Sequence, residues 1–263
     1  SENKVESFWG ETVQRVNFSS DEIFCETDKQ THIAKMIVGC DGMNSKIREL
    51  SEINYRSWSY NQTAVVANFK TSINESCIKQ TFTSVGPLAL LPINDKESTM
   101  IWSIDDDVSY KFLAMSDEEF TSEVVNKFGE QIGELNMISK RQHFPLHHLS
   151  AKTFAKKGIF LVGDSAHHIH PLAGLGLNSG IGDVICLSEL IESNSLENLE
   201  EIILAYNRKR IPINLGLAAS MEAFKRGFGQ KNIWLRLFRN TAFNFANKMS
   251  PLKKKFMELA TEL

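Results

Sequence analysis

A carboxylate and several glycines lie close together in the segment 157–183 and could form a binding site. Gly163 and Asp164 directly follow the apolar run Gly158–Val162, so Asp164 stands where a strand is expected to end. Open α/β sheets bind their ligands at the carboxyl ends of their strands. Asp164 is therefore predicted to occupy a binding position rather than a packing position.

A glycine-rich turn, 174–178, follows Pro171 and leads into an apolar helix expected from Ser179 to Ile191. The glycines at 174 and 176 let the backbone come close to a flat or anionic group. The free N–H groups and the positive dipole end of the helix point at such a group. The turn and the helix start together predict a cradle that stabilises negative charge.

Two buried strands are expected to position these residues. Gly158–Val162 is a short, β-branched apolar run between glycines, as expected for a strand buried on both faces. Ala34–Val38 is a second such run. The residues before it have the pattern of a meander, with strand material at Val5–Gly10, Glu11–Val16 and Ile23–Thr27.

Residues 55–150 have the pattern of a mostly β insert. Short strands separated by turn residues are expected at 63–70, 78–83, 88–92 and 99–104. Ser116 and Glu119 have the spacing of a capping box, and Phe120 and Val124 fall on one face of the helix that it opens. After the insert, the chain returns at Gly158 to the domain that precedes the insert.

The composition is that of a folded protein without a membrane span. The chain has 263 residues, a net charge of −3 and 42% hydrophobic residues, which is enough for one substantial core or two small ones. No apolar run approaches the roughly 18 residues of a transmembrane helix, and the polar start has no signal-peptide character. The four cysteines form no CxxC pair, which favours a reduced, cytoplasmic setting.

The pattern around Asp164 resembles the second FAD motif of flavin-dependent monooxygenases of the para-hydroxybenzoate hydroxylase type. That motif reads Gly-Asp-(Ala/Ser)-Ala-His, then Pro, then a Gly-x-Gly-x-Asn turn, then Asp. The matching residues here are Gly163, Asp164, Ser165, Ala166, His167, Pro171, Gly174, Gly176, Asn178 and Asp183. So many residues in register are more specific than a lone glycine-rich motif. Leu175 departs from the family, in which Gln is common at this position.

A second motif of the same family precedes the insert. Asp41 and Gly42 supply a tight turn, and Asn44 or Ser45 can cap the short helix that follows. In the family, Asp, Gly, Ser and Arg recur at the spacing of Asp41, Gly42, Ser45 and Arg48. The family motif lies near the FAD pyrophosphate and the path of the nicotinamide cofactor. Taken alone, these residues would also fit an ordinary turn with a surface ion pair.

The resemblance implies an α/β protein with a Rossmann-like FAD-binding domain, an inserted mostly β, α+β substrate domain and C-terminal helices. The implied segments are 1–54 and 151–195 for the FAD-binding domain, 55–150 for the substrate domain and 196–263 for the helical region. The family begins with a βαβ unit whose GxGxxG turn holds the ADP half of FAD, and residues 1–39 do not contain it. We therefore expect either a fragment of a longer enzyme, with an incomplete N-terminus and weak flavin binding, or a shortened homologue without catalysis.

The chemistry implied by the resemblance is oxygen transfer. NAD(P)H reduces FAD, the reduced flavin takes up O₂ as a C4a-hydroperoxide, and this species hydroxylates an electron-rich ring. Asp164 is assigned to a ribityl hydroxyl, the N–H groups at 175–177 to the pyrimidine edge of the ring, Pro171 to the oxygen-reacting side and His167 to the loop beside the flavin. No side chain is assigned as a general acid or base. The full set of cofactor residues implied is Gly163, Asp164, Pro171, Gly174, Leu175, Gly176, Leu177 and Asn178, with Asp41, Gly42 and Arg48 near the pyrophosphate or the nicotinamide cofactor.

The insert narrows the resemblance to one branch of the family. Gly86–Pro92, followed by Ile101–Ser103, is similar to the branch that hydroxylates ubiquinone precursors. The expected partners are thus a phenolic or quinone-precursor substrate, O₂ and other quinone-biosynthesis proteins. A phenol hydroxylase, an epoxidase or a prenyl reductase on the same frame stays open as an alternative, as does a non-catalytic binding protein.

The region from residue 196 onward is expected to be helical and is rich in basic and aromatic residues. Such helices could lie on the anionic inner face of a membrane, or residues such as Arg208, Lys209 and Arg210 could form a solvated face of helices packed on the core. Nucleic-acid binding is not expected, because the chain is acidic overall. A metal site is not expected either, because the three histidines in 167–170 share one loop and have poor geometry for a tetrahedron.

Overall fold

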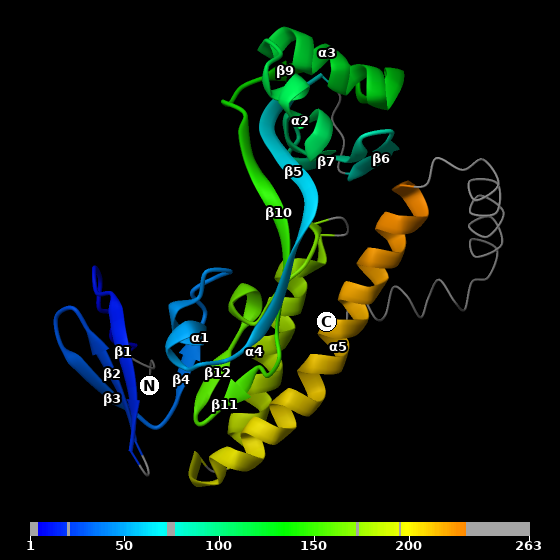
Figure 1. The fold of residues 1–263 in the computed structure, drawn as a ribbon. Coiled ribbons are helices and arrows are strands. Elements are labelled where there is room, and N and C mark those ends of the chain that lie inside the picture. The colour runs from blue at the N-terminus through cyan, green and yellow to red at the C-terminus, as the bar shows by residue number, and fades with distance from the viewer. Residues whose placement is uncertain (1–4, 20–21, 73–76, 172–173, 195, 230–263) are drawn as a thin grey trace. The chain divides into compact units, whose positions relative to one another are not determined.

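The computed structural model describes residues 5–19, 22–72, 77–171, 174–194 and 196–229 (Figure 1). Contacts divide this part of the chain into two compact units. The first contains the described residues up to Ser57 and those from His148 to Met221, and the second contains Trp58–His147 together with residues 222–229. The chain passes between them in β5 (Tyr55–Thr71) and in β10 (Gln142–Ala151). The division into segments 1–54, 55–150, 151–195 and 196–263 that the sequence suggests stays a prediction.

The first unit begins with an antiparallel meander, although not with every strand that the sequence predicts. Its strands are β1 (Val13–Phe18), β2 (Ile23–Thr27) and β3 (Thr31–Ala34). The strand expected at Val5–Gly10 is wrong, since these residues are irregular and end in a turn. The expected strand Ala34–Val38 is two strands, because Ala34 pairs within the meander whereas β4 (Ile37–Gly39) joins a different sheet.

That second sheet has the order β11–β12–β4, with β11 spanning Ala155–Lys156 and β12 spanning Ile159–Leu161. β12 is buried at all three residues, so the prediction of a buried strand here is confirmed. β12 and β4 are parallel, with Leu161 opposite Gly39. Both strands therefore deliver the residues that follow them to the same edge of the sheet.

Helices pack around this sheet and form the core of the first unit. They are α1 (Lys46–Leu50), α4 (Leu175–Ser193) and α5 (Leu199–Gly229), with the short 3₁₀ segments η2 (Gly163–Ser165) and η4 (Leu196–Asn198). Leu187 and Leu190 from α4 and Ile202 and Tyr206 from α5 join Phe160 of β12 in one apolar cluster. Figure 1 shows α4 and α5 in green and yellow beside the strands.

Helix α4 begins four residues earlier than predicted. Gly174 is its N-cap, in the left-handed conformation with φ of 63°, and Leu175 is its first residue. Gly174 and Gly176 were expected to lie in a turn before the helix, but Gly176 lies within the helix itself. The flavin-facing groups proposed at 175–177 are thus in the first turn of α4.

The second unit is a mostly antiparallel sheet covered by two helices. Its strands follow the order β10–β5–β8–β7–β6, with β9 paired to β5, and β8 carries the fully buried Trp102. Trp102 packs against Phe112 of α2 (Asp106–Leu113) and Phe120 of α3 (Asp117–Phe128). The capping box predicted at Ser116 is confirmed. The remaining strands are β6 (Lys79–Thr83), β7 (Gly86–Asn94), β8 (Glu97–Asp105) and β9 (Leu135–Met137).

Together the two units give the mixed α/β class with a mostly β insert that the sequence predicts. Within the ranges that the structure describes, no helix is long and apolar enough to span a membrane. The basic and aromatic residues from Lys231 onward lie outside these ranges.

Candidate functional site

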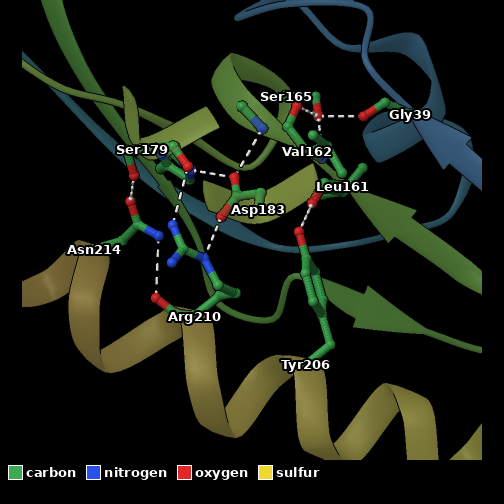
Figure 2. A network of polar contacts seen from close by, with 11 residues as sticks. Gly39, Leu161, Val162, Ser165, Ser179, Asp183, Tyr206, Arg210 and Asn214 are labelled. Atoms are coloured by element: carbon green, nitrogen blue, oxygen red, sulfur yellow. Dashed lines mark hydrogen bonds and ion pairs between the residues drawn. The ribbon is translucent and has the colours of Figure 1, made fainter. Parts of the chain in front are cut away.

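The Asp-Gly and Gly-Asp motifs meet at one edge of the β4–β12 sheet. β4 leads to Asp41 and β12 leads to Asp164, and the two strands are parallel neighbours. Ser165, which directly follows Asp164, donates from its hydroxyl to the Gly39 carbonyl, and Figure 2 shows this contact. The Val162 N–H donates to the same carbonyl, with N and O 3.0 Å apart. The two motifs are therefore joined by hydrogen bonds within one sheet edge.

Asp41 fixes the start of α1. Its Oδ2 accepts hydrogen bonds from the backbone N–H groups of Lys46 (2.6 Å) and Ile47 (3.0 Å). Ser45, one of the two predicted caps, is the N-cap, and its hydroxyl accepts from the Arg48 N–H. A carboxylate bonded to the first N–H groups of a helix also lies favourably at the positive end of the helix dipole.

Arg48 connects the two motifs from inside the protein. It is buried, so the alternative of a surface ion pair is wrong. Its Nη1 donates to the Ser165 carbonyl at 2.8 Å and its Nη2 donates to the Met43 carbonyl at 2.7 Å. The guanidinium also lies 4.6 Å from the centre of the Tyr55 ring. Both Nη groups are thus held by backbone carbonyls, whereas Nε is buried without a partner among the described residues, and the assignment of Arg48 to the cofactor site stays a prediction.

Asp164 is about half exposed and is held on one side only. Its Oδ2 accepts a hydrogen bond from His168 Nδ1 at 2.9 Å, and 48% of its side chain is accessible. Its Oδ1 accepts from no donor among the residues that the structure describes. The hydrogen bond from His168 lowers the pKa of Asp164 below its ordinary value, although partial burial opposes this shift. Asp164 is thus a carboxylate with one oxygen left for a ligand.

A second carboxylate, Asp183, lies fully buried behind the same turn (Figure 2). Its Oδ2 accepts from the Gly163 N–H at 2.9 Å and from His167 Nε2 at 2.6 Å. Its Oδ1 accepts from Arg210 Nε at 2.6 Å. Burial raises the pKa of Asp183, but these donors and the charge of His167 outweigh burial, and the pKa falls below the ordinary value. Asp183 therefore anchors the Gly-Asp turn to both α4 and α5.

Arg210 was expected on a basic outer face, and this expectation is wrong. The residue is 4% exposed and donates from Nη2 to the Ser179 carbonyl at 2.9 Å. Asn214 links the same two helices, since its side chain accepts from the Ser179 hydroxyl and donates to the Arg210 carbonyl. The sequence did contain one signal for this network. Asp183 lies four residues from the apolar Leu187 in helical spacing, and a carboxylate on a buried face needs a cationic partner.

The N-terminus of α4 is open to a ligand. The N–H groups of its first turn have no partner within the helix, and no acidic side chain lies there to neutralise them. A Cβ placed on Gly174 or Gly176 would meet no atom of the described residues within 4 Å. A Cβ on Gly180 would lie 3.3 Å from Gly163 Cα, which shows how closely α4 approaches the Gly-Asp turn.

The remaining predicted residues fall around this opening. Pro171 is exposed and its carbonyl accepts from the Gly174 N–H at 3.1 Å. Leu177 and Asn178 are both exposed on the first turn of α4. His167, in contrast, is buried, stacks on Phe154 and donates a hydrogen bond from Nε2 to Asp183. Across the described segments, no cluster of three or more His, Cys, Asp or Glu side chains could hold a metal ion.

Comparisons with known proteins agree with this geometry. Residues 17–219 match the family model described as FAD binding domain. The chain is 31% identical over 239 residues to the ubiquinone hydroxylase UbiL of Rhodospirillum rubrum, covering 89% of this chain and 56% of that protein. It is 28% identical over 235 residues to the 3-demethoxyubiquinol 3-hydroxylase of Escherichia coli, covering 88% of this chain and 60% of that protein.

A solved structure gives the same fold at lower identity. The p-nitrophenol 4-monooxygenase PnpA from Pseudomonas putida superposes with a TM-score of 0.75 at 18% identity, over 97% of this chain and 67% of that one. The chain spans somewhat more than half the length of the two curated relatives named above. The match to the family model covers most of the chain, from the meander into α5. The chain therefore belongs to the FAD binding domain family.

Proposed function

We propose that this protein is an FAD-dependent hydroxylase that acts on the aromatic ring of a ubiquinone precursor. Two relatives are named as hydroxylases of ubiquinone or a ubiquinol, which supports the substrate class. The observation that carries the proposal is the pairing of an open helix N-terminus with a half-exposed carboxylate. This pairing offers donors for a negatively charged ring and an acceptor for a hydroxyl.

The residues at this opening fit FAD. We assign the free Oδ1 of Asp164 to a hydroxyl of the ribityl chain, because a carboxylate oxygen without a donor is an acceptor. The first-turn N–H groups of α4 are assigned to the pyrimidine edge of the ring, since glycine at 174 and 176 leaves this backbone uncovered. Asn178 and Pro171 complete the rim, with Pro171 on the oxygen-reacting side. Asp41 and Gly42 are placed toward the pyrophosphate or the nicotinamide cofactor.

Once bound, FAD supplies the redox chemistry, taking electrons from NAD(P)H and activating O₂ for transfer to the ring. The protein groups have a different task. The positive end of α4 would stabilise negative charge on the reduced ring system. The anchoring of the turn by Asp183 limits its movement during this charge change. No side chain is required as a general acid or base.

The proposal extends to partners and location. We assign residues 55–150 to binding of a phenolic or quinone-precursor substrate, and O₂ is the second substrate. We also propose a cytoplasmic enzyme with peripheral contact to the inner face of a membrane and to other quinone-biosynthesis proteins. The residues that would carry the membrane contact lie mostly beyond Lys231, outside the described ranges.

Oxygen incorporation tests this function. The protein is incubated with FAD, NAD(P)H, ¹⁸O₂ and a short-chain prenyl phenol, and the product is examined by mass spectrometry. One ¹⁸O atom in the ring hydroxyl is expected. Oxidation of NAD(P)H without labelled product would favour a reductase on the same fold. Absence of both reactions in flavin-loaded protein would contradict the proposal and favour a non-catalytic homologue.

A further inference from the structure

We infer that His168 is a positioning residue for the cofactor, because it holds the Asp164 carboxylate in the orientation that leaves Oδ1 for a ligand hydroxyl. The inference rests on the proposed function only for the identity of that ligand. The pair itself follows from the geometry, in which His168 Nδ1 lies 2.9 Å from Asp164 Oδ2. Neither the sequence motif nor the assignment of Asp164 requires a histidine at this position.

Both partners of this hydrogen bond are attached to fixed backbone. His168 lies in β13 (His167–His168) and pairs with Leu149 of β10. Asp164 lies in η2, whose Gly163 N–H is bonded to the buried Asp183 and whose Gly163 carbonyl accepts from the Ala166 N–H at 2.8 Å. The backbone positions of His168 and Asp164 are therefore fixed by contacts other than the hydrogen bond between their side chains.

A half-exposed carboxylate without a partner would sample several rotamers. Ordering such a side chain when a ligand binds has an entropic cost, and a hydrogen bond that orders it beforehand removes part of that cost. His168 donates one hydrogen bond to Oδ2 of Asp164. The other oxygen, Oδ1, keeps its capacity to accept a hydrogen bond. This is the arrangement that preorganisation of a binding site requires.

The groups around Asp164 lower its pKa. His168 acts on Asp164 through a hydrogen bond and through its charge, and His167 acts through charge alone. The first turn of α4 adds no acidic side chain. Removing His168 leaves partial burial, which disfavours the charged carboxylate. The pKa of Asp164 should therefore rise in a variant that lacks the donor.

The test compares His168→Ala with His168→Asn in the full chain. The Asn side-chain amide can place an N–H near the position of His Nδ1, whereas Ala removes the donor. The Asp164 carboxyl is titrated by ¹³C NMR without ligand, and FAD affinity is measured by fluorescence at neutral pH. His143→Ala serves as the control, since His143 is an exposed histidine of the second unit.

We expect the pKa of Asp164 to rise in His168→Ala and to return part of the way in His168→Asn. FAD affinity should fall roughly twofold to tenfold in the Ala variant, the range of one net hydrogen bond, and recover in the Asn variant. His143→Ala should change neither quantity. Equal melting temperatures will show that the variants remain folded.

Three results separate the possible failures. An unchanged Asp164 titration in His168→Ala would overturn the pairing. A shifted titration with unchanged FAD affinity would overturn the positioning role while keeping the pair. Absence of FAD binding in the unmodified chain would remove FAD as the ligand and contradict the proposed function, and the titration would still decide whether His168 holds the carboxylate.

Discussion

Asp183 and Asp164 lie beside the same turn, yet the protein surrounds them differently. Asp183 is 0% exposed and accepts hydrogen bonds from a backbone N–H, a histidine and an arginine. Asp164 is half exposed, accepts one hydrogen bond from a histidine, and keeps an oxygen without a donor in the described part of the chain. One carboxylate is fully used by the protein, and the other is not.

This difference shows how a binding residue can be told apart from a structural one within a single motif. A buried charge is tolerated only when its partners replace the water that it loses. Asp183 meets this condition and, because its side chain is fully buried, is not accessible to a ligand. Asp164 retains both solvent access and a free acceptor, which is what recognition of a hydroxyl requires. The variants below separate these two roles.

The largest effect is expected for Asp183→Asn. The change leaves Arg210 as a buried cation without its carboxylate, and removal of one partner of a buried pair costs roughly 3–5 kcal/mol. Urea unfolding followed by circular dichroism measures the loss. Glu189→Gln, an exposed change on the same helix, should stay within about 0.5 kcal/mol. Similar losses in the two variants would contradict the anchoring role of Asp183.

The double variant Asp183→Asn, Arg210→Met sharpens this result. Because it removes both charges, its cost should be smaller than the sum of the two single costs, with a coupling of roughly 0.5–3 kcal/mol. A double-mutant cycle in urea gives this number directly. Additive costs would mean that the two side chains stabilise the turn independently of one another.

Asp164→Asn should have little effect on stability and a clear effect on FAD affinity. Since Asp164 is half exposed, the unfolding free energy should change by less than about 0.5 kcal/mol. The amide can accept from His168 with its oxygen, and it then presents an NH₂ group where the free carboxylate oxygen was. FAD affinity should therefore fall by about tenfold, as expected for loss of a hydrogen bond to a charged acceptor. Isothermal titration calorimetry measures this change.

A smaller effect is expected in the pH dependence of stability. Both carboxyls have lowered pKa values, so the stability that they contribute is present above the ordinary carboxyl range near pH 4. It is lost as the pH falls through their lowered values. Unfolding free energies between pH 3 and 7 should decline less steeply in Asp183→Asn, and barely differ from the unmodified chain in Asp164→Asn. A flat profile in the unmodified chain would contradict this sign.

Local signals in the sequence were sufficient where structure is decided locally. The buried strand at 159–161, the Ser45 cap and the capping box at Ser116 each depend on neighbouring residues, and all were predicted. The start of α4 was missed because glycine at 174 and 176 favours a turn over a helix. In the structure, Gly174 serves as the left-handed N-cap and Gly176 lies in the first helical turn.

The parts that were missed depend on contacts between distant segments. The strand predicted at 34–38 is divided because its two halves join different sheets, which no local pattern reveals. Arg210 lies 27 residues from Asp183, and its burial depends on how α5 packs on α4. Asp164 and Asp183 both belong to the same sequence motif, which does not distinguish a ligand-binding carboxylate from a structural one. Only the packing shows that one is enclosed and the other is open.

The most direct test is an equilibrium titration with FAD, followed by flavin fluorescence, on the unmodified chain, Asp164→Asn and Glu189→Gln. If Asp164 and the first turn of α4 hold the cofactor, the unmodified chain and Glu189→Gln should bind with equal affinity, and Asp164→Asn should bind about tenfold more weakly. Equal affinity in all three proteins would place FAD elsewhere, and absence of binding in all three would remove FAD from this site.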